Sequence, residues 1–364
     1  MITRKSIALA AMLLTLTLTA PLMAQRRNGN DAQQKGPDYN PKAGSADEFA
    51  AFQGIQNEQD PTNKINLADA FLTKYPSSQL AGYVQRFRME SFSRLRKYKE
   101  AAAAGEAGLA LETKYLSDLI AKADQQAADA KDKSKKDKKD KDKEPLINKN
   151  SAEFKAIADN TEKAMMYYYQ NLMTAYQNLN DAEKTVEWGR KALSEDPEDV
   201  TALLTVSSVM AARPKDDKNP NGFDQKEAED LGKKGLNRLN AVFSGPMGAQ
   251  LRPEDKAEML ASAHETIGRI YLNNKKYPEA QREFGQAIVS KKDDSQAYFF
   301  MGMAMAQDKG KVEDAMENFA KAVYLKGPIS TQADSVLKDL FKQTKKPLEG
   351  YDDFVKAAGA KIGK

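Results

Sequence analysis

The sequence contains no cysteine and a single histidine. Without thiols the chain has no disulfide, no thiolate nucleophile, no cysteine-ligated metal and no lipid-modified N-terminal cysteine. One histidine is too few for a histidine-rich metal site. A phosphate-binding loop and a glycine-rich dinucleotide turn are also missing. We therefore expect no catalytic residue, no bound metal and no cofactor.

The sequence also has no large excess of positively or negatively charged residues. The chain has 56 Lys and Arg against 52 Asp and Glu, a formal charge of +4, and the two signs are interspersed. This balance argues against a nucleic-acid-binding face. The exception is the run from Lys131 to Lys143, which holds almost nothing but Lys and Asp. We interpret it as a solvated linker, because it has no apolar surface to bury; a weak contact with an anionic surface is the alternative.

A long apolar run occurs only at the N-terminus. Arg4 and Lys5 precede an apolar stretch from Ile7 to Ala20, and the small residue Ala24 follows. This order is typical of a signal peptide, so we expect an exported protein, periplasmic or secreted, cleaved after Ala24. An uncleaved anchor is the alternative, but a run of about 14 residues is shorter than the roughly 20 that span a bilayer. We expect no transmembrane segment in the mature chain.

Two stretches near the C-terminus are copies of each other, offset by 34 or 35 residues. Gly268 corresponds to Gly302, and Phe284 corresponds to Phe319. The other matched pairs are Ile267/Met301, Tyr271/Met305, Ala280/Ala315 and Ala287/Ala322. A period in this range indicates stacked helical hairpins, because one hairpin cannot bury its apolar face alone. The small residues let paired helices approach closely, and the phenylalanines fill the space beside them.

Helical periodicity extends the array toward the N-terminus. Ser45, with Glu48 three residues later, predicts the first helix start, and Pro253 followed by two acidic residues predicts another. We divide the chain into a signal peptide (1–24), a flexible leader (25–44), two divergent N-terminal hairpins (45–125), a Lys/Asp-rich linker (126–150), a repeat array (151–327) and C-terminal capping helices (328–364).

The repeats resemble tetratricopeptide repeats (TPRs), a family of 34-residue helix–turn–helix units. The matched pairs fall where that family places Leu-Gly, Tyr, Ala, an aromatic residue and Ala. A third hairpin matches at Leu172, Tyr176 and Ala192 but departs at Thr185 and Gly189. The resemblance implies an all-α fold, a right-handed α-solenoid of TPR-like repeats of a secreted or periplasmic bacterial type. It also implies a concave groove that binds protein or peptide partners.

Carried over by position, the resemblance places candidate groove residues on the first helix of three hairpins. These are Tyr167, Gln170, Thr174, Asn178, Glu265, Arg269, Asn273, Phe299, Met303 and Gln307. The family's carboxylate clamp has Lys and Asn at two of these positions, where this chain has Glu265 and Arg269, so a chaperone-tail clamp is not expected. Phe299 and Met303 suggest an exposed apolar spot. The alternative is that this face packs against the next helix of the stack.

Two further residues are interpreted as packing residues. His264 stands where the repeat has a large core residue, and we expect it to be buried without a partner carboxylate. Trp188 lies on a second helix, where packing or a surface patch explains it. The sequence therefore predicts a non-catalytic protein-interaction scaffold of the cell envelope. A self-associating structural oligomer, or a ligand-binding or enzymatic module on a helical-repeat frame, are the alternatives.

Overall fold

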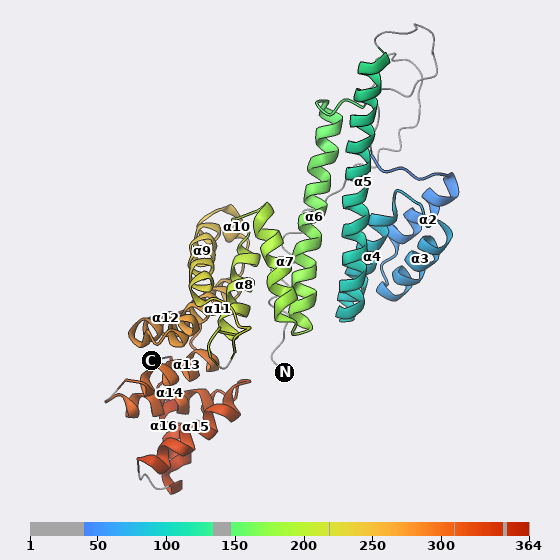
Figure 1. Cartoon of the computed structure of the whole chain (residues 1–364). Helices are drawn as coiled ribbons and strands as arrows, with labels where there is room; N and C mark the ends of the chain where they lie inside the picture. The colour runs from blue at the N-terminus through green and yellow to red at the C-terminus, as the bar shows by residue number, and fades with distance from the viewer. Residues whose placement is uncertain (1–39, 134–146, 218, 309, 345–347, 364) are drawn as a thin grey trace. The chain divides into compact units, whose positions relative to one another are not determined.

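The computed structural model describes residues 40–133, 147–217, 219–308, 310–344 and 348–363. The predicted signal peptide, the leader up to residue 39 and most of the Lys/Asp run lie outside these ranges. The chain divides between Glu195 and Asp196 into two compact units. Apart from two isolated β-bridges, Pro214–Phe223 and Asp216–Asn219, the regular elements of the described residues are all helices (Figure 1).

The N-terminal unit consists of three helical hairpins. Its helices are α2 (Ala46–Asn57), α3 (Pro61–Lys74), α4 (Ala81–Arg94), α5 (Tyr98–Lys133), α6 (Ala152–Asn178) and α7 (Ala182–Glu195). Within each hairpin the two helices pack together, and the second helix also packs on the first helix of the next hairpin. Phe52, Ile55 and Phe71 form the core of the first hairpin and are nearly inaccessible to solvent.

The C-terminal unit repeats this arrangement and ends in two further helices. It contains α8 (Val200–Ala212), α9 (Gln225–Ser244), the short α10 (Pro246–Ala249), α11 (Pro253–Asn273), α12 (Tyr277–Ser290), α13 (Ser295–Ala306) and α14 (Val312–Tyr324). The chain then forms α15 (Ser330–Gln343), the 3₁₀ turn η1 (Leu348–Gly350) and α16 (Tyr351–Gly359). Both α15 and α16 pack on α14, and so cover the last hairpin.

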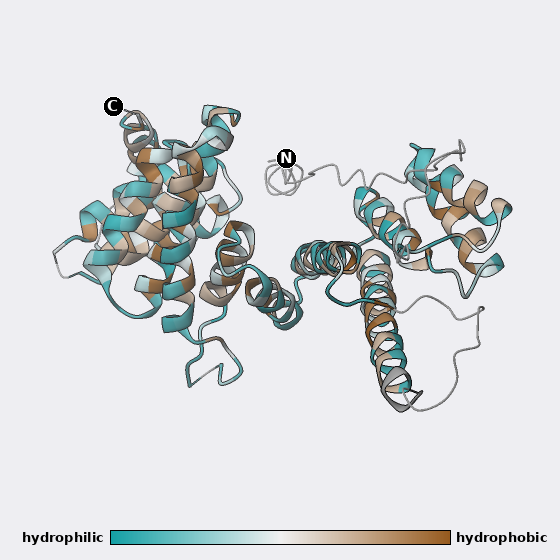
Figure 2. Ribbon diagram, turned by 90° about the horizontal axis from the view of Figure 1, so that it is seen from above, coloured by the Kyte–Doolittle hydropathy of each residue, from teal (hydrophilic) through white to brown (hydrophobic). Residues whose placement is uncertain are grey.

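The packing of the small residues confirms the predicted TPR-like helix pairs. A Cβ atom added to Gly268 would lie 2.6 Å from Cε1 of Phe284, and one added to Gly302 would lie 2.9 Å from Cε1 of Phe319. Ala280, Ala287 and their counterparts in the next repeat are fully buried. The fold is therefore an all-α array of helix–turn–helix units. In Figure 2 hydrophilic and hydrophobic residues alternate around the helices, as expected for helices with one buried face.

The predicted helix starts are confirmed, with one difference in detail. The Ser45 hydroxyl accepts a hydrogen bond from Glu48 N at 3.1 Å, and Pro253 is the first residue of α11. The Glu48 carboxylate, however, accepts from Gly44 N at 2.6 Å and from the Ser78 hydroxyl in the turn between α3 and α4. The end of the predicted leader is thus attached to the first hairpin. Lys42 N adds a hydrogen bond to Gln79 Oε1 at 2.9 Å.

The predicted linker differs from the structure. Residues 126–133 continue α5, and α6 begins at Ala152, so the Lys/Asp run connects two antiparallel helices of one unit. Phe154 and Ile157 of α6 pack against Tyr115 and Leu119 of α5. The alanine-rich sequence of α5 favours a continued helix over a linker. The boundary between the units lies instead after α7.

Candidate functional site

One face of the C-terminal unit carries two partly buried charged side chains on α11 that contact the neighbouring first helix, α13. Glu265 and Arg269 are one turn apart on α11, so they point the same way. Gln296 and Phe300 are one turn apart on the neighbouring first helix, α13. All four side chains are partly buried. We call these four residues the α11–α13 site.

Polar and aromatic contacts hold the α11–α13 site together. Gln296 Nε2 donates a hydrogen bond to Glu265 Oε1 at 2.6 Å. The guanidinium carbon of Arg269 lies 5.0 Å from the centroid of the Phe300 ring, a cation–π contact. Phe300 stacks in turn on Phe284, with centroids 5.8 Å apart and an interplanar angle of 17°. Because Phe284 also fills the space beside Gly268, the repeat core itself positions the Arg269 guanidinium.

The electrostatics of the two charged residues are unusual for a helix surface. Burial raises the pKa of Glu265 to about 8, and Asp294 adds to the rise, while Arg269, the Gln296 amide and Lys291 oppose it. Burial also lowers the pKa of Arg269, and the charge of Glu265 opposes this shift. Arg269 keeps its charge, because an arginine remains protonated even after such a shift. At neutral pH most Glu265 is protonated, and the pair carries a net positive charge.

The remaining C-terminal candidates do not join this site. Of the two alternatives for Phe299, the exposed apolar spot is wrong and packing within the stack is what the structure has: Phe299 is 2% exposed and packs edge-on against Phe319. Met303 packs against the same cluster, which Leu337 and Phe341 of α15 complete. The cause is that α15 and α16 cover the end of the array, which turns a predicted surface position into core. Gln307 is exposed at the end of α13.

Asn273 has a structural contact. Its Nδ2 donates to Ala211 O at 2.8 Å and to Gln225 Oε1 at 3.0 Å. Gln225 donates to Met210 O and Phe223 O, so these amides hold the inserted segment between α8 and α9. Asn273 therefore supports a loop.

The four candidates on α6 lie in the N-terminal unit. Tyr167 donates to Glu90 Oε1 at 2.6 Å, and the Arg86 guanidinium lies 4.9 Å from its ring centroid. Thr174 donates to the carbonyl of Gln170 at 2.9 Å, and Asn178 donates to the carbonyl of Thr174 at 2.8 Å. Tyr167 thus connects α6 to α4, and the polar groups of Thr174 and Asn178 bond to their own helix.

His264 also differs from expectation. It is partly buried, and its Nδ1 lies 2.9 Å from Glu283 Oε2 on α12. The expected absence of a partner carboxylate is wrong. The partner is 19 residues away and comes close only because α11 and α12 form a hairpin. The contact therefore joins two helices of the core.

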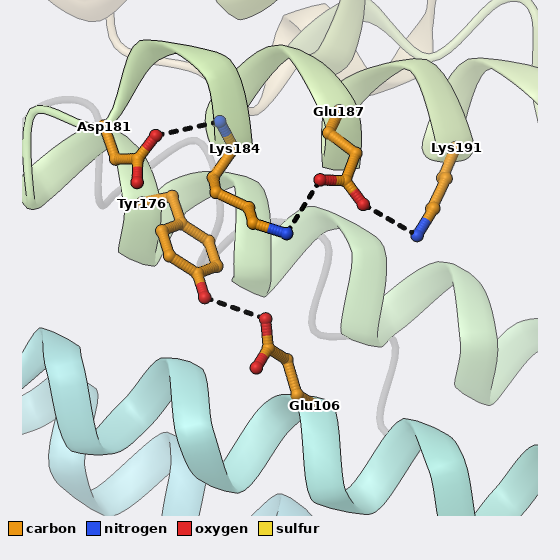
Figure 3. A network of polar contacts seen from close by, with 6 residues as sticks. All are labelled: Glu106, Tyr176, Asp181, Lys184, Glu187 and Lys191. Atoms are coloured by element: carbon orange, nitrogen blue, oxygen red, sulfur yellow. Dashed lines mark hydrogen bonds and ion pairs between the residues drawn. The ribbon is translucent and has the colours of Figure 1, made fainter.

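Trp188 packs as expected. It is 6% exposed, and its ring stacks on Tyr169 with centroids 6.0 Å apart. Lys191 Nζ lies 3.8 Å from the Trp188 ring centroid. The same ammonium pairs with Glu187, which Lys184 binds from the other side, in the polar network of Figure 3. Nearby, Tyr176 donates to Glu106 Oε1 at 2.7 Å and so joins α6 to α5.

The N-terminal unit contains a buried acid, Glu112, that was not predicted from the sequence. Glu112 of α5 is 7% exposed and lies against Gly82 of α4, where an added Cβ would be 2.8 Å from Oε1. Burial raises the pKa of Glu112 to about 6, against the charge of Arg86. Tyr168 donates to Gly82 O at 2.9 Å in the same region. The available signal was the helical spacing, because Glu112 follows Gly105 and Gly108 on the packed face of α5.

Within the part of the chain that the structure describes, neither a metal-binding cluster nor a charged pocket offers a competing site. Within the described residues, no group of three or more metal-ligating side chains is placed to hold an ion. An open pocket of about 790 Å³ lies beside the start of α9. Lys215, Lys226, Lys276, Asp224, Glu229 and Asp230 line it, so its lysines and acids balance. None of the helices in the described ranges combines the length and apolar composition needed to cross a membrane.

No family model matches this sequence, and no curated protein matches it. Among solved structures it is similar to YrrB, a TPR protein with an unusual peptide-binding site, at 19% identity over 58% of this chain and 94% of that chain, with a TM-score of 0.37. It is also similar to the C-terminal part of a TPR repeat-containing protein from Cytophaga hutchinsonii, at 12% identity over 87% and 95% of the two chains, with a TM-score of 0.44.

A thermophilic TPR protein from Thermus thermophilus is similar at 13% identity over 70% of this chain and 98% of that chain, with a TM-score of 0.36. Scores and identities this low do not transfer a binding site from one chain to another. The assignment of TPR-like hairpins therefore rests on the helix pairing and the small-residue contacts described above.

Proposed function

We propose that this chain is an exported, non-catalytic scaffold of the cell envelope that binds protein segments at the α11–α13 site. Stacked hairpins present their first helices side by side, and such surfaces hold extended or helical segments of partners. The export assignment rests on the sequence of the first 24 residues. The absence of catalysis is expected from a chain without cysteine and with one histidine.

One observation carries the choice of site. Arg269 is partly buried and charged, and its contact on α13 is the uncharged Phe300 ring, whereas His264 and Tyr167 each contact a carboxylate. Among the described residues, no carboxylate forms an ion pair with Arg269. Buried charge without a partner is costly, so a site that keeps it is expected to meet a ligand group.

Site-specific photo-crosslinking in the native envelope fraction tests this proposal. A photoreactive residue at Ser262, exposed and one turn before Glu265 on α11, should form adducts with a partner protein. The matched control places the same residue at the exposed Arg282 on α12, outside the α11–α13 site. Arg269→Glu should remove the adducts formed from position 262. Adducts that form equally from both positions, or that survive Arg269→Glu, would place binding elsewhere.

Light scattering on the purified chain separates partner binding from self-association. A monomer is expected at micromolar concentration. An oligomer that Arg269→Glu dissociates would instead assign this face to contacts between copies of the chain.

A further inference from the structure

The Arg269 guanidinium contacts an aromatic ring, but no carboxylate of the described residues forms an ion pair with it. Its carbon lies 5.0 Å from the Phe300 centroid, and Phe300 is fixed by its stacking on Phe284. Burial disfavours the charged form of the side chain, and its pKa is lowered accordingly. A cation–π contact compensates only part of such a desolvation cost. A negatively charged group of a partner would compensate the remaining desolvation cost of the guanidinium.

Glu265 does not serve as that anion. Gln296 donates to its Oε1, and the nearby Asp294 disfavours a second negative charge. With a pKa of about 8, the Glu265 carboxyl is mostly protonated at neutral pH, so it offers an O–H donor. Asp294 is itself engaged, because its Oδ1 accepts from Gln296 N and Ala297 N at the start of α13, both at 3.0 Å. The site thus presents one cation and one neutral acid.

We propose, building on the function above, that the α11–α13 site binds the side-chain carboxylate of an aspartate or glutamate in the partner segment. A guanidinium has a planar fork of N–H donors that matches the two oxygens of a carboxylate. The guanidinium carbon lies 5.0 Å from the centroid of the Phe300 ring, and the Glu265 hydroxyl adds a donor one turn away on α11.

A side chain fits this site better than the C-terminal carboxylate of a chain. The clamp that captures a chain end in TPR proteins has Lys and Asn side chains where this chain has Glu265 and Arg269, and the other mode of capture uses free backbone N–H groups arranged as a nest. Glu265 and Arg269 lie in the interior of α11, where each backbone N–H is bonded to the carbonyl four residues earlier. The donors on this face are therefore side chains, and they suffice for one carboxylate.

Protonation of Glu265 sets the pH range of binding. The groups that face it are Arg269 on its own helix, Asp294 and Gln296 at the start of α13, and Lys291 at the end of α12. Above about pH 8 the Glu265 carboxylate competes with the ligand for Arg269. Binding is therefore expected to weaken as the pH rises through this value, and Glu265→Gln is expected to remove most of that weakening.

Three short peptides distinguish a side-chain carboxylate from a C-terminal carboxylate. The first, acetylated and amidated, carries one Glu between two Leu residues; the second has Gln in its place; the third has Gln and a free C-terminal carboxylate. Each is titrated into the full chain while the Nε–Hε resonance of Arg269 is followed by NMR. The Glu peptide should shift this resonance with a dissociation constant of about 1 mM or tighter.

The Gln peptide and the free-carboxylate peptide should bind at least tenfold more weakly. Arg269→Gln should weaken binding of the Glu peptide by tenfold or more. The matched variant Arg282→Gln on α12 should leave binding unchanged. Because Arg269→Gln removes the Nε–Hε resonance, the resonances of Gln296 report binding in that variant. No response to the Glu peptide up to about 10 mM, or equal binding of the Gln or the free-carboxylate peptide, would overturn the proposal. Crosslinks from position 262 that persist alongside such a result would show that the face binds partners through another group.

Discussion

The ring of Phe284 lies against the backbone of Gly268, so close that a Cβ there would be 2.6 Å from Cε1 and 2.8 Å from Cδ1. The next repeat has the same relationship between Gly302 and Phe319. Both rings are fully buried. A glycine on one helix and an aromatic ring on its partner therefore set the helix separation in each hairpin. Phe284 also supports Phe300, which links the repeat core to the α11–α13 site.

Gly268→Ala is expected to lower the free energy of unfolding of the C-terminal unit by about 1–3 kcal/mol, because the new methyl group must displace the Phe284 ring. The matched control is Gly285→Ala on α12, where a Cβ would meet only Met301 Cε at 3.8 Å. That variant should gain about 0.5–1 kcal/mol from the higher helix propensity of alanine. Urea denaturation followed by circular dichroism measures both.

If Gly268→Ala proves as stable as Gly285→Ala, the close helix contact does not determine hairpin stability. Gly302→Leu, at the equivalent position, should likewise destabilise the hairpin of α13 and α14, since its Cβ would lie 2.9 Å from the Phe319 ring.

Glu112→Gln is expected to stabilise the N-terminal unit above pH 6. The folded-state pKa of Glu112 is raised from 4.5 to about 6, so the folded state loses stability as the pH rises from 4.5 through about 6. The shift corresponds to about 2 kcal/mol at most. The gain from Glu112→Gln should therefore be present near neutral pH and vanish at acid pH. Trp188, the single tryptophan, lies in this unit, and its fluorescence reports unfolding.

The control for this pH series is Glu100→Gln, an exposed position on the same helix. It should leave the dependence of stability on pH unchanged. A pH profile of Glu112→Gln that parallels the profile of the unaltered chain would contradict the assignment of Glu112 as an acid whose pKa is raised by burial.

Lys191→Met should cost the N-terminal unit about 0.5–1 kcal/mol more than Lys184→Met. Both lysines pair with Glu187, at 3.1 Å and 2.9 Å, so each variant loses one partly exposed ion pair (Figure 3). Only Lys191 also lies over the Trp188 ring, at 3.8 Å from the centroid. Thermal unfolding of the two variants, followed by circular dichroism, measures the difference. Equal losses would show that the cation–π contact contributes nothing to stability.

Tyr351→Phe should loosen α16 from the end of the array. The Tyr351 hydroxyl donates to Asp334 Oδ1 at 2.5 Å, and Lys338 Nζ lies 2.8 Å from Asp334 Oδ2. Loss of a hydrogen bond to a charged group costs about 1.5–3 kcal/mol. Amide exchange in α16 should accelerate accordingly, while exchange in α11 and α12 stays unchanged. Uniform acceleration through the whole unit would mean that α16 does not open separately.

Much of the fold followed from local patterns. Apolar residues at helical spacing, the start signals at Ser45 and Pro253 and the repeated Gly268 and Phe284 positions predicted the hairpins and their packing. The linker from residue 126 to 150 was placed too early, because α5 continues to Lys133 and Gln126 Oε1 accepts a hydrogen bond from Ile147 N, a contact between residues distant in the sequence.

Two of the four residues of the α11–α13 site were among the candidates named from the sequence. Glu265 and Arg269 were named from the repeat position alone, whereas Gln296 and Phe300 were missed, although they too lie one turn apart on a first helix. The contact between His264 and Glu283 was missed because the two residues meet only when the hairpin closes.

The sequence by itself determined that the chain forms helical hairpins and which residues bring each pair of helices together, because helical periodicity and side-chain size act between near neighbours. The tertiary structure alone decided which positions remain open to a partner. Met303 and Arg269 hold the same repeat position, yet Met303 packs against a core that α15 completes, while Arg269 rests on Phe300 without a counter-charge among the described residues. Burial depends on whatever segment packs across a face, and that segment can come from anywhere in the chain.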